Sequence, residues 1–489
     1  MTFGRRSASR SGVRVPRGGA FLFALGLFCL GGCTVGPQYV RPSAEVPASY
    51  AEGGIWKPAQ PSDAAPKGSW WDVFDDPQLN ALEEQINVSN QSLRVAQDQF
   101  LQARAAVRIA RAGLFPSVTG GASVAPTHQS SNQPSFNRSS EAVNYTTYLL
   151  PVDVSYEADV WGSVRRTVEA SRSEAQASAA DLANVNLSLH AELALDYFQL
   201  RGLDAQKQLF DSSVAAFEKA LSLTETRHNG GVASEVDVAQ ARTLLETTRA
   251  QATDLGVQRA AFEHAIAVLI GKPASSFHLQ ALPLSTPPPS IPAGAPSDLL
   301  ERRPDIAAAE RRMQEANAQI GVARAAYFPL INLTGSGGFE SAALGTLLQG
   351  PSAFGELIAA ATQTLFDAGR RHAVSDQARA AYDQSVATYR QTLLVALQEV
   401  ADNLAALQVL ADEAKQEDVA VESAQHSVAL SLNRYRGGVT SYLEVVTAQN
   451  IALADQRTAV DILTRRLAAS VLLAKAIGGG WNVSQIPRI

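Results

Sequence analysis

The residue types that most often carry out chemistry are few in this chain and do not converge. Its seven histidines are scattered, and none belongs to a His-Glu-x-x-His metal motif. The glycine-rich run Gly335-Ser336-Gly337-Gly338 lacks the Gly-Lys-Ser/Thr ending of a phosphate-binding loop. Because an enzyme needs several polar groups at one place, the sequence predicts no catalytic residue, no metal site and no bound cofactor.

The N-terminal segment has the pattern of an export signal. Residues 1–18 contain five arginines and no acid, and the apolar run that begins at Ala20 ends in Leu30-Gly31-Gly32-Cys33. This run is about half as long as the roughly 20 residues that a membrane-spanning helix needs. Residues 1–32 are therefore expected to be a cleaved signal peptide.

The end of the apolar run resembles the lipobox of bacterial lipoproteins. That resemblance implies a covalent lipid on Cys33, which becomes the first residue of the mature chain. An ordinary cleavage beside an unmodified cysteine is the alternative. Thr34 follows, rather than an aspartate, and by the same resemblance this implies sorting to the outer membrane.

The composition narrows the possible partners. The only other cysteine, Cys29, lies in the removed segment, so the mature chain has no disulfide and depends on packing. Removal of the five signal arginines changes the formal net charge from -6 to -11. The basic surface that a nucleic-acid partner requires is absent.

Internal repetition is the most informative feature of the sequence. The run from Ala110 to Pro116 shares Ala-Arg-Ala and Phe-Pro with the run from Ala323 to Pro329, 213 residues later. The run from Arg227 to Val232 recurs as Arg434 to Val439, 207 residues later. The chain is therefore expected to contain two copies of one unit, with a longer loop in the first copy.

Proline-rich segments separate the expected parts of the chain. Residues 283–296 contain six prolines, which indicates a linker between the copies. The expected parts are a signal peptide at 1–32, a lipid-anchored extended tether at 33–70, a first repeat at 71–273, a proline-rich linker at 274–297, a second repeat at 298–480 and a C-terminal tail at 481–489.

Each copy should form a short helix and then a long helical hairpin. A first helix is expected from Asp76 to about Gly113. The span from Ser163 to Asn229 is rich in Ala, Leu, Gln and Glu, which predicts one helix of 67 residues and about 100 Å. Gly-Gly turns at 230 and 437 should reverse the chain. Helices of this length must pack along other long helices.

Alternation of polar and apolar residues predicts two strands in each copy. The expected strands are 117–125, 152–157, 330–339 and 357–366, the last with poor alternation. Four strands cannot close a barrel, and an open sheet edge is not tolerated in lipid. A membrane barrel needs at least 8 strands, so two or more chains would have to combine. A soluble β-hairpin domain is the alternative.

Several motifs carry a resemblance over nearly the whole mature chain. They are Trp70-Trp71, Leu299-Leu300-Glu301-Arg302-Arg303-Pro304-Asp305-Ile306, Ala323-Arg324-Ala325-Ala326-Tyr327-Phe328-Pro329 and Tyr435-Arg436-Gly437-Gly438-Val439. Together they resemble the TolC-like outer-membrane efflux factors, in particular the lipoprotein branch of the OprM or NodT type.

This resemblance implies a mainly α protein with a transmembrane β-barrel. Two tandem repeats per protomer would form a homotrimer whose 12-stranded outer-membrane barrel continues into a long α-helical periplasmic tunnel. The implied function is a passive exit duct of a tripartite efflux pump, with a periplasmic adaptor (membrane fusion) protein and an inner-membrane RND-type pump as partners. A trimeric coiled-coil envelope stalk or adhesin without transport is the alternative.

The resemblance also singles out the ends of the long hairpins. It implies that residues just after the Gly-Gly turns line a constriction, and these are Asp237 and its repeat mate Glu444. Three copies of each would form two acidic rings that attract cations. The alternative is that an acid in the first helical turn only stabilises the helix dipole.

Two further groups of residues are implied at the hairpin ends. Arg227, Arg434 and Tyr435 are candidates for contacts that hold the ends closed, with solvated surface as the alternative. His228 occupies in the first copy the place of Tyr435, so a tyrosine contact is not expected there. The turn residues expected to meet the adaptor are Gly230, Gly231, Val232, Gly437, Gly438 and Val439.

Overall fold

The computed structural model describes residues 34–43, 47, 69–130, 143–284, 286–291 and 298–489. The expected signal peptide and the lipid site at Cys33 lie outside these residues. The chain divides into two compact units. Unit 1 combines the described parts of Met1–Tyr39, Ala106–Ser171 and Glu315–Tyr382; unit 2 combines those of Val40–Ala105, Arg172–Gln314 and Asp383–Ile489.

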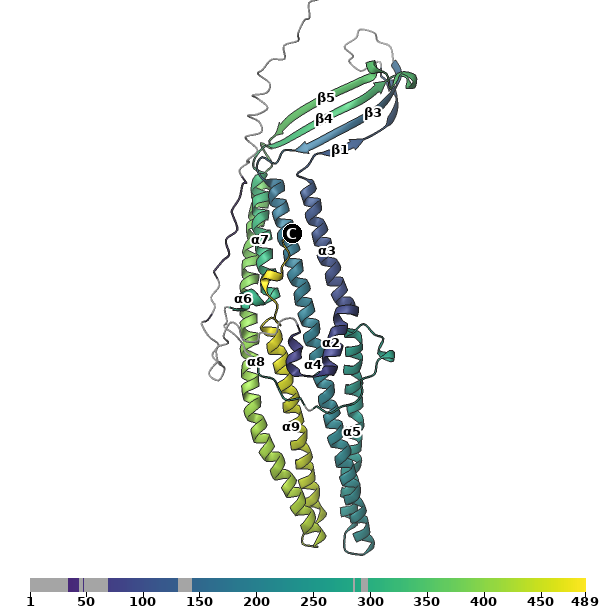
Figure 1. Cartoon of the computed structure of the whole chain (residues 1–489), viewed down its shortest axis with the longest axis vertical. Helices are drawn as coiled ribbons and strands as arrows, with labels where there is room; N and C mark the ends of the chain where they lie inside the picture. Colours follow the sequence, from purple (N-terminus) through teal and green to yellow (C-terminus); the bar gives the residue numbers. More distant parts are fainter. Residues whose placement is uncertain (1–33, 44–46, 48–68, 131–142, 285, 292–297) are drawn as a thin grey trace, which may run out of the picture. The chain divides into compact units, whose positions relative to one another are not determined.

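Unit 1 contains an antiparallel sheet (Figure 1). Its order is β1-β3-β4-β5, and β2 also pairs with β3. The register of the β1 pairs continues unchanged into the β2 pairs, so the two segments are parts of one strand position. The strands are β1 (Ser117–Gly120), β2 (Ser123–Gln129), β3 (Val143–Glu157), β4 (Leu330–Ser341) and β5 (Ala353–Thr362).

The interruption between β1 and β2 lies opposite Pro151. Proline has no backbone N–H and cannot donate to the ladder. Its carbonyl still accepts from the N–H of Gly121 at 3.0 Å.

The two copies share one hairpin register. Val118 faces Val154 in the first copy, and Ile331 faces Ala361 in the second. Ile331 follows Val118 by 213 residues, and Ala361 follows Val154 by 207 residues, which are the two offsets of the sequence repeat. The repeat therefore holds at the level of single residue pairs.

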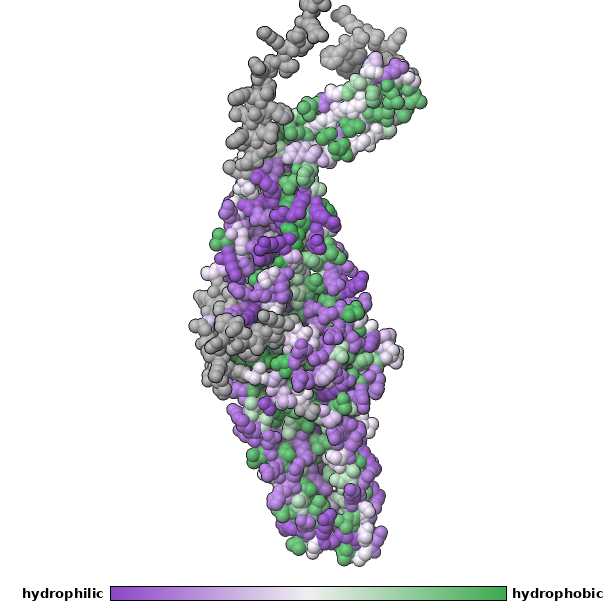
Figure 2. Space-filling model, viewed as in Figure 1, coloured by the Kyte–Doolittle hydropathy of each residue, from purple (hydrophilic) through white to green (hydrophobic). Residues whose placement is uncertain are grey.

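One face of the sheet is polar and the other is apolar. Asp153 faces Ser336 across β3 and β4, and the Ser336 hydroxyl donates to Asp153 Oδ1 at 2.6 Å. Figure 2 shows hydrophobic residues gathered over the sheet. The exposed large residues of the apolar face include Val118, Val124, Val152, Val154, Leu333 and Leu357.

The strand predictions need three corrections. The first strand, expected at 117–125, is interrupted after Gly120 and runs on to Gln129. The second strand begins at Val143, not near Val152. The fourth strand is Ala353–Thr362, four residues earlier than expected at both ends. The alanines at 359–361 give no clear alternation, so pairing with β4 sets the position of this strand instead.

Unit 2 is built from helices, several of which also contribute residues to unit 1. α4 and α8 each contain 67 residues, and α5 and α9 each contain 35. The predicted helix from Ser163 to Asn229 is confirmed. The helices are α2 (Pro77–Ser89), α3 (Gln91–Ala112), α4 (Ser163–Asn229), α5 (Glu235–Leu269), α6 (Leu299–Arg302), α7 (Pro304–Ala325), α8 (Arg370–Arg436) and α9 (Tyr442–Ala476), with short 3₁₀ turns η1 (Trp70–Phe74), η2 (Ala274–Ser276) and η6 (Val483–Gln485). The 3₁₀ turns η4 (Leu344–Thr346) and η5 (Gly350–Ser352) lie in unit 1.

The expected first helix is in fact two helices. Asn90 separates α2 from α3 and has an extended ψ of 124°. Its side-chain oxygen accepts from the N–H of Leu93 at 2.8 Å, and its Nδ2 donates to the carbonyl of Leu269 at 2.7 Å. A cap and a contact 179 residues away in sequence fix this break, and the local pattern did not show it.

The long helices pack closely in unit 2. Phe210 and Phe217 of α4 form a buried cluster with Leu244 and Leu245 of α5. Gly202 lets α4 approach α9, because a Cβ at this position would overlap the side chain of Thr464. By length and composition α8 contains one 18-residue stretch apolar enough to cross a membrane. Helices packed along other helices show the same composition.

Candidate functional site

The turns of the two hairpins have the same backbone construction. In the first, Val232 N–H bonds to the Arg227 carbonyl at 2.9 Å across Gly231, whose φ is 75°. In the second, Val439 N–H bonds to the Arg434 carbonyl at 3.0 Å across a glycine with φ 73°. This bond pattern with a left-handed glycine is the Schellman ending of a helix, so the backbone geometry favours glycine at the second position of each Gly-Gly turn.

Asp237 lies in the first turn of α5 as part of a capping box. The Ser234 hydroxyl accepts from the Asp237 N–H at 3.2 Å, and Asp237 Oδ2 accepts from the Ser234 N–H at 3.1 Å. The carboxylate thus stabilises the start of α5. This role is compatible with a second role in a pore, because the side chain remains partly exposed.

Glu444 occupies the equivalent position in α9 with different partners. No side-chain bond caps α9 at Ser441. Glu444 Oε2 lies 3.8 Å from Arg434 Nη1, and the two side chains are about half exposed. An exposed pair of this kind contributes little stability, so the charge of Glu444 is held loosely near the turn.

The structure brings Arg227 and Tyr435 together. The guanidinium carbon of Arg227 lies 4.9 Å from the ring centroid of Tyr435. Arg227 Nη1 also donates to the carbonyl of Arg436 at 3.0 Å. Two of the three residues implied for closed-state contacts therefore contact each other across the two repeats, whereas Arg434 pairs with Glu444 in its own hairpin.

Tyr442 completes this contact, and the sequence analysis did not name it as a site residue. Its ring packs edge-on against Tyr435, with centroids 5.2 Å apart. Both tyrosines are buried, together with Val445. Burial raises the pKa of Tyr442 to about 12. Tyr442 follows Tyr435 by seven residues, so the two rings lie on either side of a tight turn. This spacing was the feature of the sequence from which the contact could have been predicted.

The first repeat replaces this aromatic pair by polar residues. His228 and Glu235 are the repeat mates of Tyr435 and Tyr442, and their side chains lie 3.2 Å apart. His228 Nδ1 also contacts the carbonyl of Ala233 at 3.0 Å. His228 therefore has polar partners at the position that holds the aromatic pair in the second repeat.

A second cluster of titratable groups lies away from the turns. Glu83 of α2 and His190 of α4 are both buried, and His190 Nδ1 lies 2.6 Å from Glu83 Oε2. Burial raises the pKa of Glu83 to about 9 and lowers that of His190 to about 4. Both groups are therefore neutral at pH 7, with the Glu83 hydroxyl donating to Nδ1. We assign the Nε2 proton of His190 toward Asn87 Oδ1, 3.4 Å away.

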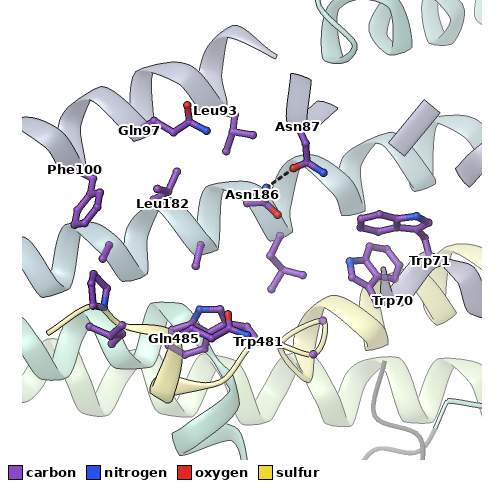
Figure 3. A pocket seen from close by; sticks show the side chains of 18 residues that line it. Trp70, Trp71, Asn87, Leu93, Gln97, Phe100, Leu182, Asn186, Trp481 and Gln485 are labelled. Carbon is purple, nitrogen blue, oxygen red and sulfur yellow. Dashed lines mark hydrogen bonds between the residues drawn. The ribbon is translucent and has the colours of Figure 1, made fainter. Parts of the chain in front are cut away.

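Figure 3 shows a cavity of about 630 Å³ that is lined in part by Trp71. The ring of Trp71 stacks on His190, with centroids 4.3 Å apart. The cavity is lined by Trp70, Trp71 and Trp481, and by amides such as those of Asn87 and Asn186, which share a hydrogen bond of 3.0 Å. None of its lining residues is an acid, a base or a histidine. The cavity thus lacks the groups of an acid–base active site. Among the described residues no cluster of His, Cys, Asp and Glu could hold a metal ion.

A buried ionic network holds the segment after η2 against the first hairpin. Asp204 of α4 accepts from Arg201 Nη1 at 2.9 Å and from Arg259 Nε at 2.7 Å. It also accepts from the N–H of Leu282 at 3.1 Å. The repeat mates of Arg201 and Asp204 are a glutamine and an alanine. The first hairpin is therefore attached to the linker by an ionic network. The glutamine and the alanine at the equivalent positions of the second hairpin cannot form such a network.

The structure defines a class of protein with two repeats. Each repeat supplies one very long helical hairpin and one pair of strands with an apolar face. The comparisons specify the family. Two segments, residues 82–272 and 295–479, match the family described as "Outer membrane efflux protein", and the chain belongs to this family.

Individual relatives agree along almost the whole chain. The probable efflux pump outer membrane protein TtgC of Pseudomonas putida is 33% identical over 461 residues, which are 94% of this chain and 95% of TtgC. OprJ of Pseudomonas aeruginosa is 33% identical over 474 residues, 96% of this chain and 97% of OprJ. The solved structure of the outer-membrane channel OprN matches with a TM-score of 0.85 and 31% identity, over 92% of this chain and 100% of that one.

The protein is thus an outer-membrane channel component of efflux pumps that extends into the periplasm, and it is a transport protein rather than an enzyme. The expectations for family, fold class, function and location are confirmed by these matches.

Proposed function

We propose that three copies of this chain close one 12-stranded barrel that forms the exit duct of a tripartite efflux pump. The observation that supports this proposal is that the sheet has two open edges. β5 forms one edge, and β1 together with β2 forms the other, and each pairs with a neighbouring strand on one side only. Open edges are costly in lipid. Four strand positions per chain fall below the minimum of 8 for a membrane barrel.

The hairpin ends are the closed end of this duct. The Arg227–Tyr435 contact links the two hairpins of one chain, so it restrains their separation. Asp237 and Glu444 occupy equivalent first-turn positions, and three copies of each form two acidic rings at the constriction. Such rings attract cations and raise the cost of anion entry.

The remaining partners are proposed because the relatives are named as efflux pump outer membrane proteins. The turns Gly230 to Val232 and Gly437 to Val439 meet a periplasmic adaptor, which connects the duct to an inner-membrane pump of the RND type. A lipid on Cys33 holds the mature chain in the outer membrane.

Conductance in planar bilayers tests the proposal. The purified protein should migrate as a trimer and produce discrete, cation-selective channel events. A purified protein that forms no trimer, or a trimer that produces no channel events at any voltage, would overturn the proposed barrel.

A further inference from the structure

The cavity of about 630 Å³ is a part of unit 2 that the proposed function does not use (Figure 3). All of its lining residues belong to unit 2. Its volume lies within the range of about 300–1,000 Å³ that is usual for small-molecule sites. None of the described residues that line it carries a charge. A charged ligand would lose its water there without gaining an ionic partner, so the lining favours a neutral one.

Aromatic rings form much of the lining. Figure 3 shows Trp70 and Trp71 at one end of the cavity, Phe100 at the other and Trp481 between them. The face of an aromatic ring is electron-rich, so it attracts the weakly positive hydrogens of C–H groups. The flat side of a sugar ring presents several such hydrogens together. The aromatic walls are therefore suited to a saccharide as well as to a hydrocarbon.

A glycine-rich loop after α9 holds Trp481 in the lining. The three glycines at 478–480 all have a positive φ, between 55° and 93°, which other residues rarely adopt. A Cβ at Gly479 would overlap the side chain of Leu187. Trp481 itself packs against alanines of α4 and α7. The first repeat has Gly-Lys-Pro-Ala at 271–274, so the end of a hairpin does not by itself require this loop.

Two amide side chains in the lining are held in fixed orientations. Asn186 Nδ2 donates to Asn87 Oδ1 at 3.0 Å. His190 Nε2, which lies 3.4 Å from the same oxygen, supplies a second donor, because the Glu83 hydroxyl keeps Nδ1 as an acceptor. Within the described part of the chain, Asn87 Nδ2 and Asn186 Oδ1 have no protein partner. One donor and one acceptor therefore remain side by side for a ligand.

We propose that this cavity binds a neutral saccharide. One sugar ring packs against Trp481, and its hydroxyls bond to Asn87 Nδ2 and Asn186 Oδ1. A hydroxyl both accepts and donates, so one hydroxyl or two neighbouring ones satisfy the amide pair. The site lies within one chain and does not depend on the proposed trimer.

A hydrocarbon fits the same lining less well. It would contact the aromatic rings but would separate the amides of Asn87 and Asn186 from water. A buried polar group without a partner is costly. The amide pair thus favours a sugar over an apolar aromatic molecule such as toluene, and toluene serves as the rival probe.

Calorimetric titration of the purified full-length protein in detergent tests the site. The probes are cellotriose, chitotriose and permethylated cellotriose, which keeps the sugar rings but has no hydroxyl donor. At least one of the two unmodified sugars should bind roughly 10-fold more tightly than the permethylated one, because hydrogen bonds to the amide pair are lost.

The two unmodified sugars also distinguish the possible sources of the ligand. Chitotriose consists of the N-acetylglucosamine that occurs in the cell-wall glycan. Tighter binding of chitotriose, together with co-sedimentation of the protein with purified cell-wall sacculi, would support the site and identify that polymer as the source. Tighter binding of cellotriose would support the site and identify a soluble oligosaccharide.

Variants locate the binding. Asn186→Ala and Trp481→Leu should each weaken sugar binding by roughly 3- to 10-fold. The matched controls lie outside the cavity. Asn403→Ala removes an amide that bonds within α8, and Trp161→Leu removes a ring that stacks on Phe328 in unit 1. Both controls should leave the affinity within about 2-fold of the wild type.

Three results would overturn the proposal. They are binding of toluene without binding of either unmodified sugar, equal affinity for the permethylated and unmodified sugars, and losses in the control variants as large as those in the cavity variants. The comparison of the sugars uses the wild-type protein, so it decides the question even if a cavity variant does not fold.

Discussion

The guanidinium of Arg227 rests on the ring of Tyr435, with 4.9 Å between the guanidinium carbon and the ring centroid. Arg227 lies in the last turn of α4 of the first repeat, and Tyr435 lies in the last turn of α8 of the second. Because Tyr435 also packs against Tyr442 at the start of α9, one arginine contacts an aromatic pair that spans the other hairpin's turn. Any separation of the hairpin ends has to break this contact.

Arg227→Ala should shift the channel toward its open form. A cation–π contact and a hydrogen bond to a carbonyl together contribute about 1–2 kcal/mol, which corresponds to roughly a 5- to 30-fold rise in the ratio of open to closed channels. Open probability in planar bilayers measures this ratio. The control is Arg242→Ala, which removes an exposed pair with Glu225; equal effects of both variants would show that the contact does not restrain the ends.

Tyr435→Phe should leave the open probability close to that of the wild type. The Tyr435 hydroxyl is buried and has no hydrogen-bond partner among the described residues, so the ring alone carries the contact. Tyr435→Ala should behave like Arg227→Ala or exceed it, because it also exposes Tyr442. A strong effect of Tyr435→Phe would instead assign a role to the hydroxyl.

Neutralising the acids should lower cation selectivity. Asp237→Asn and Glu444→Gln keep the shape of each side chain and remove its charge, and Asn retains an oxygen that can accept from Ser234. The reversal potential in a KCl gradient should move toward zero in each variant and furthest in the double variant. Arg434→Gln should move it the opposite way, because it frees the Glu444 charge. Unchanged reversal potentials in all variants would remove the acidic rings from the mechanism.

Glu83→Gln should remove a loss of stability at alkaline pH. In the folded chain burial raises the pKa of Glu83 to about 9, so the unfolded chain loses this proton first and stability falls as pH rises toward 9. His190 has its pKa lowered to about 4, and stability falls as pH drops from 6.5 toward 4. The two effects oppose each other between about 4.5 and 6.5, so the fall due to Glu83 emerges above 6.5.

Gln at position 83 still donates to His190 Nδ1, so the hydrogen bond survives without the proton. Between pH 6.5 and 9 the stability of the variant should improve relative to the wild type by about 1–3 kcal/mol. Thermal unfolding at a series of pH values measures this, with the exposed neighbour Glu84→Gln as control. A difference that grows toward acid pH would mean that the pair is ionised in the folded chain.

Asp204→Asn should destabilise the attachment of the linker to the first hairpin. It leaves two buried or half-buried arginines without their shared carboxylate, and breaking such a pair costs about 3–5 kcal/mol. Asp211→Asn on the same helix removes an exposed pair with Lys207 and should cost less than about 0.5 kcal/mol. Limited proteolysis near Leu282 should accelerate for Asp204→Asn alone; equal rates would mean that other contacts hold the segment.

Much of the architecture could be predicted from the sequence because its signals are local or repeated. The helix from Ser163 to Asn229 depends on composition and on a glycine turn, and both are read within a few residues. The offsets of 207 and 213 relate the two copies in the sequence alone. The residue pairs of the two strand hairpins are related by the same offsets. The repeated motifs, together with the N-terminal export signal, also indicated a family of exported channel proteins.

Only the tertiary structure decided where distant segments meet. The break at Asn90 depends on a carbonyl 179 residues away, and the position of β5 depends on β4 rather than on its own alanines. The neutral Glu83–His190 pair and the Arg227–Tyr435 contact join residues more than 100 positions apart. No periodicity encodes such meetings, because burial and partner choice are set by packing of the whole chain.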